Sequence, residues 1–193
     1  MRFCKKTSVF FTLLLACALV STTFGVFAAA SSIVIKNVDL KLVGDAYVLS
    51  ADSDLSFDES IEEAINKGVP LNFVVEFQVV SPRKYWFDDE ISTKNTDFTL
   101  SYHALSRQYL VSHNGHQNSY ETLSEAKLEI EQIDDWKVLE KSLVEKNAVY
   151  KAVLLVRLDQ SKLPKALQVE AIGSENWNLV SQKFEWQLKE LNK

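Results

Sequence analysis

Oxygen-bearing side chains near residue 55 recur at the spacing of a calcium-binding loop. Positions 1, 3, 5, 7, 9 and 12 of such a loop would fall on Asp52, Asp54, Ser56, Asp58, Ser60 and Glu63. The sixth position requires glycine for a sharp turn, and Phe57 stands there. We therefore expect these acids to line a solvated strand that leads into a helix, and we predict no calcium site and no other cofactor.

Two of the three histidines, His113 and His116, flank the pair Asn114-Gly115. Asn-Gly is the strongest sequence indication of a two-residue hairpin turn, which would place the two histidines opposite each other. Opposed side chains could share a metal ion, but a structural zinc site needs four ligands. We interpret both as exposed histidines at a hairpin tip and keep them only as weak metal candidates.

The octapeptide RKYWFDDE (83–90) joins two cations, three aromatic residues and three carboxylates. One interpretation is structural: Trp86 covers the end of a sheet, and the cations pair with nearby carboxylates across a turn. The other is functional: an exposed Arg83, Tyr85, Trp86 and Asp88 would form a partner-binding site, because Arg, Tyr and Trp dominate protein interfaces. The sequence leaves both open.

Familiar catalytic motifs are missing. The chain has no nucleophile elbow, no glycine-rich phosphate loop and no zinc-protease helix motif. An enzyme of unrecognised type would need a polar cleft that joins Asp88 or Asp159 to a histidine from the set His103, His113 and His116.

The first 30 residues have the order of a cleaved signal peptide. Three cations precede an apolar run, and small residues (28–30) follow it. We predict cleavage before Ser31 and export. The alternatives are a retained membrane anchor and lipidation at Cys17.

Composition narrows the function of the remaining residues 31–193, which we predict to form one domain. Both cysteines, Cys4 and Cys17, lie in the leader, so the processed chain has no thiol chemistry. Removing the three leader cations from 21 leaves 18 cations against 26 acidic residues. Such an acidic surface argues against nucleic acid or anionic lipid as the binding partner.

Alternating apolar residues predict a β-rich fold. We expect strands over 33–42, 47–57, 71–80, 98–102, 109–112, 148–160, 166–172 and 177–188. A turn at Gly44-Asp45 should join the first two. Capping boxes at Ser56/Glu59 and Thr122/Glu125 predict two short helices, the second extending to Ile133. The expected fold class is α+β, an antiparallel two-sheet sandwich of immunoglobulin-like layout with two short helices.

The stretches RKYWFDDE (83–90) and LSYHALSRQYLVS (100–112) resemble domain-of-unknown-function family 4390. The resemblance continues through AINKGVPLNF (64–73), RLDQSKLPKALQV (157–169) and WNLVSQKFEW (177–186). This chain departs from the family pattern at Ala166-Leu167, Phe87 and Phe184. The resemblance implies an exported protein of Gram-negative bacteria with no established activity. It also implies a gene that often lies beside a membrane sensor kinase of the nitrogen-regulation type.

These observations favour a non-enzymatic periplasmic module that binds a membrane or envelope protein, such as the external region of a sensor kinase. An alternative is a carrier that holds a small apolar ligand between its sheets. Such a carrier would need a cavity lined by Phe73, Phe77, Leu154 and Val156. The sequence does not decide the oligomeric state.

Overall fold

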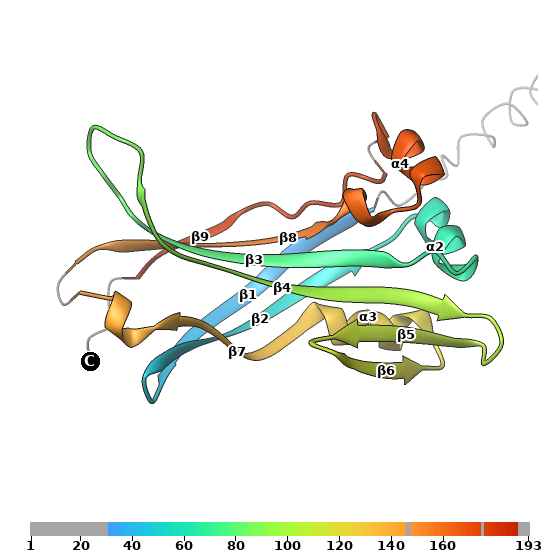
Figure 1. Cartoon of the computed structure of the whole chain (residues 1–193), viewed down its shortest axis with the longest axis horizontal. Coiled ribbons are helices and arrows are strands. Elements are labelled where there is room, and N and C mark those ends of the chain that lie inside the picture. The colour runs from blue at the N-terminus through green and yellow to red at the C-terminus, as the bar shows by residue number, and fades with distance from the viewer. Residues whose placement is uncertain (1–30, 146–147, 175, 189–193) are drawn as a thin grey trace, which may run out of the picture.

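Two antiparallel sheets face each other in the computed structural model, which describes residues 31–145, 148–174 and 176–188 (Figure 1). The smaller sheet has the strand order β1-β2-β7 and the larger has the order β6-β5-β4-β3-β8-β9. The strands are β1 (Ser32–Val43), β2 (Ala46–Ser56), β3 (Leu71–Ser81), β4 (Asp89–His103), β5 (Gln108–His113), β6 (His116–Tyr120), β7 (Gln132–Glu140), β8 (Tyr150–Leu158) and β9 (Phe184–Leu188). This arrangement confirms the predicted two-sheet sandwich.

Tight turns fix the register of two hairpins. β1 and β2 meet at Gly44-Asp45, as predicted, and Gly44 has a φ of +64°. β5 and β6 meet at Asn114-Gly115, where φ is 48° and 78°. Positive φ at both central residues is what a type I′ turn requires, so this hairpin is confirmed in type and place.

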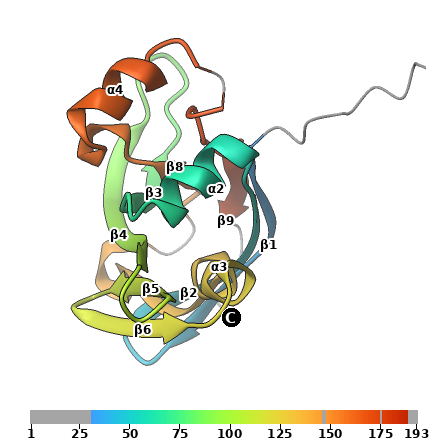
Figure 2. The ribbon, with the colours of Figure 1, turned by 90° about the vertical axis from the view of Figure 1, so that its right-hand side faces the viewer.

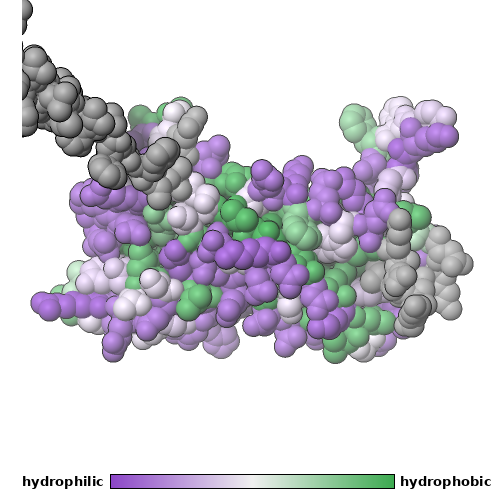
Figure 3. Space-filling model, turned by 180° about the vertical axis from the view of Figure 1, so that it is seen from behind, coloured by the Kyte–Doolittle hydropathy of each residue, from purple (hydrophilic) through white to green (hydrophobic). Residues whose placement is uncertain are grey.

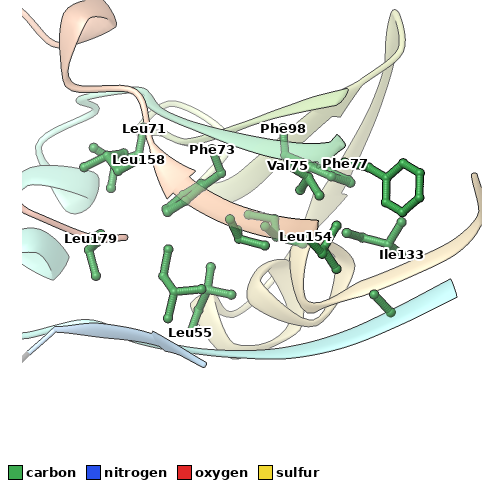
Figure 4. Packing of buried hydrophobic residues seen from close by; sticks show 14 of the residues in the cluster. Leu55, Leu71, Phe73, Val75, Phe77, Phe98, Ile133, Leu154, Leu158 and Leu179 are labelled. Atoms are coloured by element: carbon green, nitrogen blue, oxygen red, sulfur yellow. The ribbon is translucent and has the colours of Figure 1, made fainter. Parts of the chain in front are cut away.

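The core lies between the sheets. Figure 4 shows Phe73, Phe77 and Leu154 of the large sheet on the side that faces the small sheet. Phe73 and Phe77 are fully buried, and the ring of Phe57 stacks on Phe73 with centroids 5.9 Å apart. Each such side chain contributes about 1.5–3 kcal/mol by leaving water, so the alternating apolar residues of the strands dominate the stability.

The helices lie toward one end of the sandwich (Figure 1). Helix α3 (Leu123–Glu131) begins with the predicted capping box of Thr122 and Glu125, and it contacts β2, β5 and β6 (Figure 2). Helix α2 (Glu59–Asn66) starts later than the predicted box at Ser56 implies. Its N-cap is Asp58, whose carboxylate accepts a hydrogen bond from the amide of Ile61, so the prediction for Ser56 is wrong.

Two predictions for the C-terminal third are also wrong. Residues 166–172 belong to a third helix, α4 (Lys165–Ala171), which follows the short 3-10 turn η2 (Gln160–Lys162). The side-chain amide Nε2 of Gln168 donates hydrogen bonds to the backbone carbonyl oxygens of Ser161 and Leu163 at 2.7 Å each, which favours this helical turn. Of residues 177–188, only Phe184–Leu188 form a strand, while Val180 makes an isolated bridge to Arg157.

Strand β7 was not predicted. The second helix ends at Glu131, and the chain continues as the edge strand of the small sheet until the 3-10 turn η1 (Lys141–Leu143). Asp135 has a φ of 50°, and the pairing of β7 with β2 is irregular beside it. This irregularity turns two adjacent carboxylates, Asp134 and Asp135, toward the candidate site described below.

Candidate functional site

The loop between β3 and β4 stands clear of both sheets (Figures 1 and 3). It comprises residues 82–88, because Pro82 follows the last residue of β3 and cannot donate a hydrogen bond to the ladder. β3 and β4 pair over their full shared length up to Ser81 and Asp89, so the loop is carried on a long two-stranded arm. Its position is therefore set by the rigid sheet rather than by the loop itself.

Three consecutive aromatic side chains at this loop are exposed. The exposed fraction is 87% for Tyr85, 74% for Trp86 and 86% for Phe87. Trp86 and Phe87 contact each other edge to face with ring centroids 6.4 Å apart, and Lys84 lies 5.6 Å from the Tyr85 ring centroid. The interpretation in which Trp86 covers the end of a sheet is therefore wrong.

The charged residues of the same loop close its base. The guanidinium of Arg83 pairs with the carboxylate of Asp89, and the backbone amide of Arg83 donates to the carboxylate of Asp88 at 3.2 Å. The expected pairing of cations and carboxylates across the turn is thus present. All four residues proposed for partner binding are exposed, and Arg83 and Asp88 also make the contacts that shape the loop. Phe87 belongs to the exposed surface of the loop too, although it is not among the four residues predicted from the sequence.

A groove of about 810 Å³ lies between the β4–β5–β6 part of the large sheet and the α3–β7 segment. Its walls carry aromatic rings, from Phe98, Tyr120 and Trp136, and carboxylates, from Glu125, Glu129, Asp134 and Asp135. Lys137 is the cation among its lining residues. The groove therefore combines apolar surface with an excess of negative charge.

Two of these carboxylates already have partners. Glu129 accepts hydrogen bonds from the hydroxyl of Tyr120 and from the amide of Asn118, and Glu125 closes the capping box of α3. Burial, followed by the bond to Glu129 and its charge, raises the pKa of Tyr120. Asp134 and Asp135 are exposed and have no hydrogen bond or close ion pair within the described part of the chain, but the charge of Asp135 attracts Lys41 of β1.

Thr96, in β4, lines the same groove and is 6% exposed. Its hydroxyl is the one buried side-chain polar atom of the described residues that has no hydrogen-bond partner. An unpaired buried hydroxyl costs free energy, so a ligand that supplies a partner would recover it.

The two histidines of the weak metal hypothesis lie where the turn predicts them. His113 and His116 are directly opposite across the hairpin. The ring of His113 is occupied elsewhere, however: it stacks on Phe98, and its Nδ1 lies 2.9 Å from the carbonyl oxygen of Asp97. Among the residues that the structure describes, no group of three or more His, Cys, Asp or Glu side chains could hold a metal ion.

The calcium-like spacing does not form a loop. Asp52 and Asp54 lie on the extended strand β2, and Ser60 and Glu63 lie in α2. Glu63 pairs with Lys67 at 2.7 Å, which is an ordinary pair one helical turn apart. The acids follow a strand and a helix, as the sequence analysis expected.

The enzyme hypothesis required Asp88 or Asp159 to share a cleft with a histidine. Asp88 closes the exposed loop, and Asp159 accepts hydrogen bonds from the amide and hydroxyl of Ser161. His103 lies 2.9 Å from the hydroxyl of Ser106 in an exposed turn. Among the described residues, no hydrogen bond or ion pair joins Asp88 or Asp159 to a histidine.

The carrier hypothesis required a hollow between the sheets. Phe73, Phe77, Leu154 and Val156 are each at most 1% exposed and belong to one packed cluster. None of them lines the groove described above. These residues therefore act as core, and the groove lies at the side of the sandwich instead.

Among the described residues, no helix is long and apolar enough to cross a membrane. Residues 1–30, which carry the predicted signal peptide, Cys4 and Cys17, lie outside the described part. A comparison with protein families matches residues 30–187 to a domain of unknown function, DUF4390. No curated protein and no solved structure matches the chain.

Proposed function

The chain belongs to the DUF4390 family, as its sequence resemblance indicated, and from that premise we propose that it is an exported, non-enzymatic module that binds another protein of the cell envelope. Its binding surface is the aromatic loop, which we define as Tyr85, Trp86 and Phe87 on the β3–β4 hairpin.

The exposure of the aromatic loop carries this proposal. Each aromatic side chain can bury about 150–250 Å² against a partner, and Tyr and Trp do so at low cost in conformational entropy. Here all three are at least 74% exposed on a projecting arm. A soluble surface rarely places three large aromatic residues together in water unless they bind something.

We infer the compartment of the protein from its N-terminal sequence, in which cations precede an apolar run that ends in small residues. With cleavage before Ser31, the module is periplasmic. The partner is an envelope protein that offers an apolar pocket to the loop, and the external region of a membrane sensor kinase is the candidate that the family resemblance implies.

Site-specific crosslinking in intact cells tests the partner. A photoreactive amino acid at Phe87 should capture one envelope protein, and the same group at Leu105 should not. Leu105 is a suitable control because it is 92% exposed in the turn between β4 and β5. Equal capture from both positions would contradict a specific surface on the aromatic loop.

The captured partner's external region should then bind the purified protein. Replacing Tyr85 and Trp86 with alanine should weaken that binding by at least about 100-fold, since hot-spot residues typically contribute 2 kcal/mol or more each. The matched control is Leu105→Ala, which removes an equally exposed side chain. If the folded double variant still binds with unchanged affinity, the aromatic loop is not the binding surface.

The mass of the protein isolated from its cell envelope tests export separately. A chain that begins at Ser31 agrees with the proposal. A chain that retains residues 1–30, or that begins at Cys17 with a lipid attached, contradicts the processing that we propose.

A further inference from the structure

We propose that the free edge of β4, together with the groove beside it, binds an extended basic peptide segment of a partner protein as an added β-strand. The inference rests on the proposed function, since it concerns a protein partner, but it assigns a second surface with chemistry of its own. We call residues 90–96 of β4 the free edge.

The free edge exists because β4 is much longer than the strand beside it. β3 pairs with β4 from Asp89 to Leu100, whereas β5 pairs only with Phe98–His103. Figure 1 shows β5 and β6 alongside only one half of β4. Within the described residues, no strand pairs with the other side of β4 before Phe98. Backbone amides and carbonyls there are available for another strand.

The hairpin turn at Asn114-Gly115 marks where β5 ends and the free edge begins. His113 pairs with Phe98, and its ring nitrogen Nδ1 contacts the carbonyl oxygen of Asp97. An added strand would therefore continue the line of β5 toward the aromatic loop. A strand edge with unpaired backbone amides and carbonyls can pair with an added strand in either the antiparallel or the parallel direction. Peptide recognition by strand addition uses such edges.

The groove adjoins the inner face of the free edge at its Thr96 end. Thr96 shares the inward parity of Phe98, and both line the groove. Successive side chains of a strand point to opposite faces, so the inward side chains of the added strand that lie near Thr96 would enter the groove. A volume of about 810 Å³ leaves room for several such side chains.

The negative charge of the groove walls favours a basic peptide over an acidic one. The groove walls hold four carboxylates against Lys137. Asp134 and Asp135 have no hydrogen bond or close ion pair within the described residues, and the attraction of Asp135 to Lys41 still leaves the groove with an excess of negative charge. Lysine side chains of the added strand would supply ammonium donors there, while their aliphatic stems would pack against the Trp136 ring.

The unpaired hydroxyl of Thr96 is the independent observation that points to a ligand. It is buried, lies on the inner face at the free edge and lines the groove. An acidic groove alone would be an ordinary solvated surface. A buried hydroxyl without a partner beside it indicates that a polar group of a bound molecule completes the site.

A synthetic peptide of about eight residues that alternates lysine with valine is the probe, since this length matches the free edge. On binding, the amides of the free edge should gain protection from hydrogen exchange, measured by NMR. A glutamate–valine peptide of the same length should bind at least about tenfold more weakly because of the carboxylates.

Substitutions locate the site. Asp134→Asn with Asp135→Asn should weaken binding of the lysine–valine peptide by about tenfold or more, since two charged partners are lost. Asparagine tolerates the positive φ of Asp135, so the fold is kept. The control is Glu59→Gln with Glu170→Gln, an equal charge change in α2 and α4 that should leave binding unchanged. Thr96→Val should also weaken binding without lowering the unfolding midpoint.

Several outcomes would overturn the inference. These are no binding of the lysine–valine peptide, equal binding of the glutamate–valine peptide, or competition by spermidine without amide protection, which would indicate a site for small cations. Protection that appears without peptide as the protein is concentrated would indicate a second copy of this chain as the occupant.

The proposal for the aromatic loop and the proposal for the free edge can be contradicted independently of each other. Tyr85→Ala with Trp86→Ala should leave binding of the lysine–valine peptide unchanged, whatever that variant does to capture of the envelope partner. If the loop variant lost peptide binding, the aromatic loop would itself take part in binding the peptide. That result would contradict the assignment of the free edge as a second, separate binding surface.

Discussion

The imidazole ring of His113 lies parallel to the phenyl ring of Phe98, with centroids 4.0 Å apart and planes inclined by 8°. Because the carbonyl oxygen of Asp97 only accepts hydrogen bonds, Nδ1 of His113 donates to it at 2.9 Å. These contacts fasten the turn of the β5–β6 hairpin to β4 where the groove begins. The His113 side chain therefore adds to the backbone pairing of β4 with β5, whereas the sequence predicted an exposed histidine at a hairpin tip and at most a weak metal ligand.

We expect His113→Ala to lower the free energy of unfolding by about 1–2 kcal/mol, because it removes an aromatic stack and a hydrogen bond. His116→Ala is the matched control, since His116 sits opposite on the same hairpin and is exposed. Its effect should stay within about 0.5 kcal/mol. Urea unfolding measures both. Equal effects of the two substitutions would show that the stack contributes nothing particular.

The exposure of Trp86 has a direct spectroscopic consequence. The chain has four tryptophans, of which Trp177 is buried and Trp86 is the most exposed of the described set. Acrylamide should quench the fluorescence of Trp86 preferentially, so Trp86→Phe should remove the most accessible component of the emission. The free energy of unfolding should change by less than about 0.5 kcal/mol, as for other surface substitutions. A large stability loss would mean that Trp86 packs against the fold.

Local turn chemistry made much of the fold predictable. Gly44-Asp45 and Asn114-Gly115 specify turns through backbone conformations that few residue pairs adopt, and both hairpins form where expected. The box of Thr122 and Glu125 satisfies two backbone amides at once, which few other sequences do. In each case the determining interaction lies within a few residues of the chain.

Predictions failed where tertiary contacts overrode a local pattern. Ile133 fits the apolar stripe of α3, yet it lies in β7 because the chain pairs there with Ala51 of β2. Ser56 has capping-box spacing, but it is still in β2, and Asp58 caps the helix instead. Short apolar runs such as 166–172 satisfy helix and strand periods equally.

The candidate surfaces likewise combine features that the local sequence reveals with features that depend on tertiary contacts. The residue types of the aromatic loop were visible in the sequence, but their exposure was not, because burial depends on what the rest of the chain covers. The groove could not be predicted, since Thr96 and Asp135 come from strands in different sheets. The Asp134-Asp135 pair gave no local indication of it, because it stands in a stretch that already carries many charged residues.

The capping box of α3 offers a test of the groove wall. We expect Thr122→Ala to lower the free energy of unfolding by about 1 kcal/mol, because the amide of Glu125 loses its acceptor. Thr122→Ser keeps the hydroxyl and should restore most of that loss. Thermal or urea unfolding of the unchanged protein and of the two variants measures their order of stability. If serine performs no better than alanine, the cap does not stabilise the helix.

The packed core provides a test against the carrier hypothesis. Phe77 is fully buried, and its ring centroid lies 6.4 Å from that of Trp136 and 6.0 Å from that of Trp186. Phe77→Ala should therefore cost about 3–5 kcal/mol of unfolding free energy, as for other buried aromatic residues. Phe77→Leu should cost less because it leaves a smaller cavity. A negligible cost for alanine would indicate an existing hollow and would revive the carrier.

Asp159 makes the free energy of unfolding depend on pH in the acidic range. A hydrogen bond from the hydroxyl of Ser161 is the main cause that holds the pKa of Asp159 below its usual value of 3.8, and the backbone amide of Ser161 adds to it. A carboxyl group with a lower pKa in the folded state binds fewer protons there than in the unfolded chain. Its stabilisation is therefore complete above the unfolded pKa and is lost as the pH falls through the folded pKa.

We accordingly expect Asp159→Asn to flatten the loss of stability on acidification below about pH 4, since the variant has no carboxyl group to protonate at this position. Ser161→Ala should flatten it in the same direction, because it removes the hydroxyl that is the main cause of the lowered pKa. Urea unfolding at a series of pH values between about 3 and 7 gives the slopes for the three proteins. Identical slopes in all three would show that the Ser161 contacts do not favour the ionised carboxylate.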